Sequence, residues 1–83
     1  MKITVRYFAS IRELVGVGQE SLNTSSKTLT DLRQELVSRG GPYAQALGED
    51  MVVRMALNQK VCDGDAVMNE GAEIAFFPPV TGG

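Results

Sequence analysis

Gly82 and Gly83 are the residues of this sequence with the clearest chemical potential, although they carry no side chains. They follow the apolar run FFPPVT. Because glycine lacks a Cβ, the pair would pass a narrow channel, and its chemistry must use the backbone or the terminal carboxylate. Residues 80–83 span about 13 Å when extended, at about 3.3 Å per residue. The pattern predicts a slim tail that presents the Gly83 carboxylate to another protein, whereas the alternative is an inert terminus.

A carboxylate is a poor electrophile, so this chemistry requires activation, for example as an acyl-adenylate. No nucleotide-binding motif is evident, since the glycines at 16 and 18 lack the third glycine of a dinucleotide loop and follow a predicted helix. The sequence contains no histidine, the commonest general base and metal ligand. We therefore expect no bound cofactor or metal, and a separate enzyme that activates the tail.

The composition restricts the remaining classes of function. The chain has 83 residues, enough for a single domain (1–83) with a flexible tail (80–83). Its net charge of −2 is made of interspersed acidic and basic residues, which disfavours nucleic acid as a partner. Neither an apolar run of about 20 residues nor a signal-peptide layout is present, so we expect no membrane association and a cytoplasmic location. The single cysteine, Cys62, is interpreted as a small apolar strand residue.

Alternating apolar and polar residues predict the strands. Between positions 2 and 8, Ile3, Val5 and Tyr7 fall on one face. Phe8 and Phe77 have the outward parity, which predicts an exposed aromatic contact patch beside the tail unless the register is shifted by one residue. Further strands are predicted at 20–24, 51–57, 60–62 and 73–77.

Two helices are predicted between these strands. Ser10 and Glu13 match a capping box, which predicts Ser10 as the N-cap of the first helix. Thr28, with an acidic residue three positions later, predicts the start of the main helix, and a Gly-Gly-Pro sequence at 40–42 predicts its end. Residues 42–47 are expected to add one short turn. This order of elements predicts an α+β fold in which a mixed sheet packs on one main helix.

Four segments of the sequence resemble the small, sulfur-carrying subunits of molybdopterin synthases. The most specific is the last one, in which FFPPV is followed by one residue and a terminal Gly-Gly pair. The resemblance implies the ubiquitin-like β-grasp fold, which agrees with the α+β arrangement. The four segments are YFASIRELVG, TLTDLRQEL, LNQKV and EIAFFPPVTGG.

The resemblance also implies a mechanism in which the protein is not an enzyme by itself. An ATP-dependent activating enzyme would adenylate the carboxylate of Gly83, a sulfur donor would convert it to a thiocarboxylate, and the sulfur would pass to cyclic pyranopterin phosphate. For this transfer Val80, Thr81 and Gly82 would enter a pocket in the large subunit of a heterotetrameric synthase. The residues that the resemblance implies in partner binding are Phe8, Val61, Phe77, Pro78 and Pro79.

Three alternatives stay open at this point. One is a sulfur carrier that serves thiamin thiazole synthesis, which shares the Gly-Gly tail. Another is a ubiquitin-like modifier whose terminus forms amide bonds with lysines of target proteins. The third is an interaction domain with an inert tail, for which removal of Gly83 would change nothing.

Overall fold

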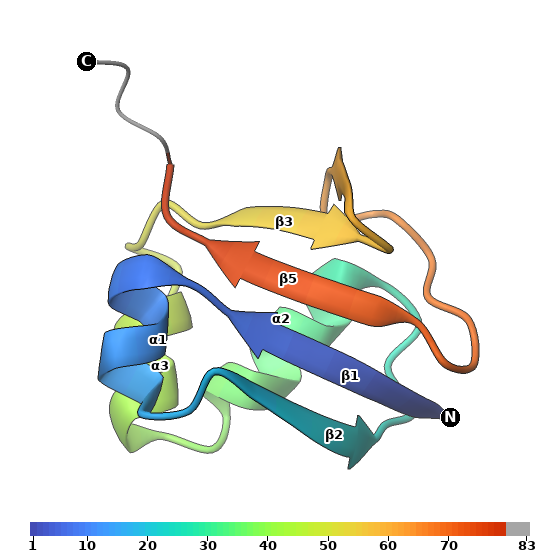
Figure 1. The fold of residues 1–83 in the computed structure, drawn as a ribbon. Coiled ribbons are helices and arrows are strands. Elements are labelled where there is room, and N and C mark those ends of the chain that lie inside the picture. Colours follow the sequence, from blue (N-terminus) through green and yellow to red (C-terminus); the bar gives the residue numbers. More distant parts are fainter. Residues whose placement is uncertain (80–83) are drawn as a thin grey trace.

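Five strands form one mixed sheet in residues 1–79, the part of the chain that the computed structural model describes (Figure 1). The predicted reactive tail, Val80, Thr81, Gly82 and Gly83, lies outside the described residues. In chain order the elements are β1 (Lys2–Tyr7), α1 (Ala9–Val15), β2 (Gln19–Asn23), α2 (Leu29–Val37), α3 (Gly41–Leu47), β3 (Arg54–Leu57), β4 (Lys60–Cys62) and β5 (Glu73–Phe77).

The first and last of these strands lie next to each other inside the sheet. The spatial order is β2-β1-β5-β3-β4. β1 and β5 pair in parallel, and the other three pairs are antiparallel. Figure 1 shows β5 leading out of the sheet at the end where α1 lies. The β5–β1 pairing therefore ties the segment before the tail to the centre of the fold.

The hydrophobic core lies between one face of the sheet and the helices. Ile3, Val5 and Tyr7 of β1 are buried, as the alternation predicts, and so are Ile74 and Phe76 of β5. Each large apolar side chain that is fully buried contributes about 1.5–3 kcal/mol. The main helix faces them with three buried leucines, Leu29, Leu32 and Leu36.

The first helix begins earlier than its sequence suggests. α1 starts at Ala9 and its N-cap is Phe8, so the prediction of a Ser10 capping box was wrong. The extended backbone of Phe8 brings its carbonyl oxygen toward the amides of Ile11 and Arg12, which donate to it at 3.1 and 3.2 Å. That carbonyl already closes the first turn, and Ser10 consequently lies inside the helix.

The main helix begins where it was predicted. The backbone N–H of Asp31 donates a 3.2 Å hydrogen bond to the Thr28 hydroxyl oxygen, so Thr28 is a true N-cap. Because a lost N-cap leaves an amide of the first turn without its partner, Thr28→Ala should lower the free energy of unfolding by about 1 kcal/mol. Ser10→Ala is the matched control and should change it by less than about 0.5 kcal/mol. Urea unfolding of both variants measures this, and equal losses would contradict the assignment.

The segment between the main helix and β3 differs from the prediction in two ways. Residues expected to make one short turn form a two-turn helix, α3, and the strand predicted from Met51 begins only at Arg54. The reason lies in Arg33 of α2, whose guanidinium donates hydrogen bonds of 2.7–2.8 Å to the carbonyl oxygens of Leu47, Gly48 and Met51. These bonds hold the end of α3 and the start of the following loop against α2, away from the sheet.

Candidate functional site

Five apolar side chains gather on the outer face of the sheet, opposite the helices. Ala56 of β3 lies directly beside Ala75 of β5 on one side and Val61 of β4 on the other. Residues that face each other across paired strands point to the same side of the sheet. Together with the half-buried Phe77 and with Phe8, they form what we call the outer patch: Phe8, Ala56, Val61, Ala75 and Phe77.

The outer patch contains a hollow of about 380 Å³. The two alanine side chains are short, so a depression remains between the larger side chains of Phe8, Val61 and Phe77. Phe8 is 38% exposed and Val61 is 62% exposed, and both line the same hollow, which makes them part of a contiguous apolar surface. Arg6, Gln59 and Glu73 complete the rim of the hollow. Such a surface suits the binding of an apolar protrusion from another protein.

A tight turn places Val61 in this patch. Asn58 and Gln59 connect β3 to β4 with φ angles of 50° and 70°. Positive φ at both central residues matches the right-handed twist of the two strands. The Asn58 side chain also accepts a 2.9 Å hydrogen bond from the backbone N–H of Glu73, which fixes the turn to β5.

Pro78 and Pro79 lie between the outer patch and the tail. Pro78 is half-buried and Pro79 is exposed. Proline fixes φ near −65°, so the chain leaves β5 in a restricted direction. The structure thus brings Phe8, Val61 and Phe77 together and places the two prolines directly after Phe77. The other predicted site residues, Val80, Thr81, Gly82 and Gly83, lie outside residues 1–79.

Charged side chains stand at the edge of the outer patch. The guanidinium carbon of Arg6 lies 5.0 Å from the centre of the Phe8 ring, and Arg6 Nη1 lies 4.0 Å from Glu73 Oε2. The sequence analysis did not identify Arg6, Ala56 and Ala75 as site residues, because a charged or small residue in a strand carries no distinctive pattern. Their positions could have indicated the outer face, since each lies two residues from one that faces outward.

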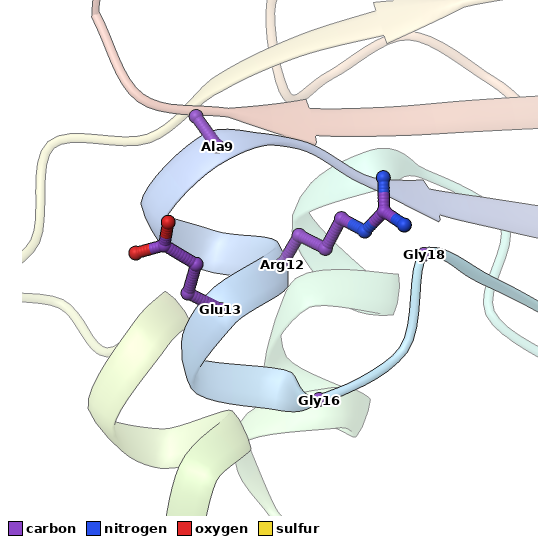
Figure 2. Close-up of a pocket in the computed structure, with 5 residues that line it drawn as sticks. All are labelled: Ala9, Arg12, Glu13, Gly16 and Gly18. Carbon is purple, nitrogen blue, oxygen red and sulfur yellow. The ribbon is translucent and has the colours of Figure 1, made fainter.

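A second hollow, of about 570 Å³, lies beside α1 and is more polar (Figure 2). Figure 2 shows the Arg12 side chain reaching toward Gly18, while the Glu13 carboxylate points another way. A Cβ on Gly18 would come within 3.3 Å of the Arg12 guanidinium, so glycine permits this close approach. Although larger than the hollow of the outer patch, this one holds no convergent set of donors and acceptors.

Glu20 of β2 is the centre of the densest polar cluster in the described part of the chain. Its carboxylate accepts hydrogen bonds from the hydroxyls of Tyr7 (2.8 Å) and Tyr43 (2.9 Å) and from the Arg39 guanidinium (2.9 Å). Partial burial alone would raise the pKa of Glu20, but these three bonds favour the carboxylate and hold the pKa below its ordinary 4.5. Burial and the neighbouring carboxylate raise the pKa of Tyr7 above its usual range. The cluster connects β1 and β2 to α3 and is structural.

This cluster predicts a loss of stability in acid. An unfolded Glu20 titrates near 4.5, so its bonds stabilise the folded state above that pH, and the contribution disappears as pH falls through the lower folded pKa. Glu20→Gln should therefore be clearly less stable than the parent at pH 7, with the difference shrinking steadily below pH 4.5. Urea unfolding across pH 3–7 tests this, with the exposed Glu13→Gln as control. A difference that is independent of pH would contradict the assignment.

The thiol of Cys62, clustered metal ligands and membrane-spanning helices are the remaining candidate features in residues 1–79. Cys62 is half-buried in β4, and burial raises the pKa of its thiol, which disfavours the nucleophilic thiolate. Among residues 1–79 no three Cys, Asp or Glu side chains converge as metal ligands would. No helix in the same range is long and apolar enough to cross a membrane.

Comparison with known proteins agrees with this geometry. Residues 5–83 match the model of the ThiS family. The chain is 41% identical to the molybdopterin synthase sulfur carrier subunit of Escherichia coli, over 98% of this chain and 99% of the relative. A relative with the same name from Haemophilus influenzae is 38% identical over the same shares of the two chains.

Solved structures show the same architecture. A putative molybdopterin converting factor subunit 1 from Pyrococcus furiosus superposes with a TM-score of 0.79 and 27% identity, over 96% of this chain and 99% of that one. A chain in the complex of subunits 1 and 2 of the molybdopterin-converting factor from Helicobacter pylori gives 0.71 and 28%, with both chains covered in full. The predicted β-grasp fold, with its mixed sheet, is thereby confirmed.

Proposed function

The chain belongs to the ThiS family and groups with its molybdopterin synthase sulfur carrier subunits, and from this premise we propose that Gly83 carries the sulfur. In this proposal the protein is the small subunit of molybdopterin synthase and is not catalytic alone. The observation that carries the proposal is the outer patch, where Phe8, Val61 and Phe77 converge at the base of the tail. A carrier needs such a surface because its partners must hold it while they act on the tail.

The proposed chemistry has two stages. An ATP-dependent enzyme first joins the Gly83 carboxylate to the adenylyl group with release of pyrophosphate, and a sulfur donor then displaces AMP to leave a thiocarboxylate. In the second stage the sulfur attacks a side-chain carbon of cyclic pyranopterin phosphate within the large subunit, where the new carbon–sulfur bond replaces a carbon–oxygen bond and the oxygen leaves. Water releases the acyl group and regenerates the carboxylate. Two such transfers complete the dithiolene that later binds molybdenum or tungsten.

The outer patch and the two prolines have separate roles in this proposal. Phe8, Val61 and Phe77 bind the large subunit and the activating enzyme in turn, so one carrier serves both partners. Pro78 and Pro79 stiffen the base of the tail, which reduces the entropy lost when Val80, Thr81 and Gly82 enter the partner's pocket. Gly82 and Gly83 pass the narrowest part, where a Cβ would collide.

Intact mass spectrometry tests the proposal directly. The protein is incubated with the activating enzyme, ATP and a sulfur donor, and we expect a mass increase that corresponds to sulfur in place of one oxygen. The increase should need ATP, and Cys62→Ser should retain it, because the sulfur resides on the carboxylate. No increase with a competent enzyme would refute the proposal, and stable conjugates with lysines of other proteins would support a modifier instead.

A further inference from the structure

We propose that Arg6 and Arg54 select the partner of the outer patch, and that they fit a protein whose apolar contact is flanked by carboxylates. The identity of that partner, the large synthase subunit, rests on the function proposed above. The selection itself rests on the position and charge of the two arginines.

Arg6 is held in place at one edge of the outer patch. Its guanidinium lies over the Phe8 ring at 5.0 Å from the ring centre, a cation–π contact that restricts the side chain. The group still reaches solvent, since the side chain is 40% exposed. Its ion pair with Glu73 has an N···O distance of 4.0 Å, the outer limit for such a pair, and exposed pairs of this kind are weak. A carboxylate of a partner can therefore bind Arg6 without displacing a strong internal contact.

Arg54 of β3 lies next to the outer patch, beside Phe77. It is exposed and directly faces Phe77 across the antiparallel β3–β5 pair, which places both side chains on the outer face. No carboxylate in residues 1–79 lies within ion-pairing distance of its guanidinium. Arg6 of β1 and Arg54 of β3 thus lie on either side of β5, the strand that ends at Phe77.

The charge at this face differs from the charge of the whole protein. The chain carries a net charge of −2, yet Arg6 and a single acid, Glu73, line the hollow of the outer patch, and Arg54 lies beside Phe77 on the same face. An apolar centre with a basic border is complementary to an apolar protrusion with an acidic border. Arginine suits this contact because its planar guanidinium binds a carboxylate through two parallel hydrogen bonds.

Charges at the rim of an interface act mainly on association and on the exclusion of wrong partners. A complementary partner is attracted and oriented before contact, whereas one with a basic border is repelled. Removal of a rim charge should therefore slow association and weaken its dependence on salt. The loss of apolar contact area would instead accelerate dissociation, so kinetics separate the two contributions.

The test is stopped-flow association of the full chain with the large synthase subunit of the same organism at low and high salt. Arg54→Glu and Arg6→Glu should each slow association roughly fivefold at low salt, and the difference from wild type should disappear at high salt. Lys27→Glu is the matched control, since it changes the net charge equally from an exposed position before α2, away from the outer patch. It should associate at nearly the wild-type rate.

Each outcome decides a different question. If wild type binds and Arg54→Glu behaves like Lys27→Glu, the inference is overturned while the proposed function stands. If wild type does not bind the large subunit at all, both fail. Arg54→Gln, which removes the charge without reversing it, should give a smaller slowing in the same direction, and thermal unfolding confirms that each variant is folded. A slowing that persists unchanged at high salt would also overturn the inference.

Discussion

Deletion of Gly83 is expected to abolish sulfur loading while the folded domain stays intact. The deletion withdraws the carboxylate by about 3.3 Å, one residue of extended chain. Because a displacement of about 1 Å at a reacting centre already costs about 100-fold in rate, loading should fall by at least that factor. Intact mass spectrometry after incubation with the activating enzyme measures it. The thermal midpoint should not change, since the deletion leaves the core of residues 1–79 untouched.

Gly83→Ala distinguishes the effect of tail length from the effect of the missing Cβ. This variant keeps the carboxylate at its original distance and adds only a Cβ, so its loading should be intermediate between wild type and the deletion. Wild-type loading of the shortened chain would exclude Gly83 as the sulfur-bearing residue. Equal losses in both variants would show that the added Cβ alone blocks the tail.

Phe77→Asp is expected to weaken binding to the large subunit by at least about 100-fold. Phe77 lines the hollow of the outer patch and lies directly before the two prolines that lead to the tail. A central aromatic residue of an interface commonly contributes 2 kcal/mol or more, and a buried carboxylate adds a desolvation cost. Isothermal titration calorimetry gives the change in affinity. Unchanged affinity would place the interface elsewhere.

A matched pair of valines controls for effects on folding, because Phe77 itself is half-buried. Val61 and Val67 are almost equally exposed, at 62% and 60%, but only Val61 belongs to the outer patch. Val61→Asp should weaken binding about tenfold, and Val67→Asp should leave it unchanged. Similar losses in both would point to a general effect of charge or stability.

The strands were predictable because their physical cause is local. The alternation of Ile3, Val5 and Tyr7 directly encodes which face is buried, and the structure confirms it. Thr28 was predictable for the same reason, since an N-cap acts within one helical turn. Outward parity also identified Phe8 and Phe77, the two aromatic residues of the outer patch.

The errors arose where distant residues decide the local structure. The apolar residues near Met51 have the composition of a strand, but Arg33 holds that backbone against α2. α3 has few apolar markers at helical spacing and begins with glycine and proline, so its sequence indicates a turn. Ser10 matches the capping-box pattern, but the extended backbone of Phe8 makes Phe8 the N-cap instead. Arg6 and Ala56 joined the site through strand pairing, which no local pattern records.

Because β1 pairs in parallel with β5, the outer patch is complete only in the fully folded protein. Phe8, Val61 and Phe77 are far apart in sequence and meet only after the last strand has inserted between β1 and β3. Contacts of such high sequence separation form late, because loop closure must precede them. A partner that recognises this surface therefore binds the native state alone and stabilises it by mass action. Immature or damaged copies would lack the outer patch and would not bind the partner, so their tails would not be loaded with sulfur.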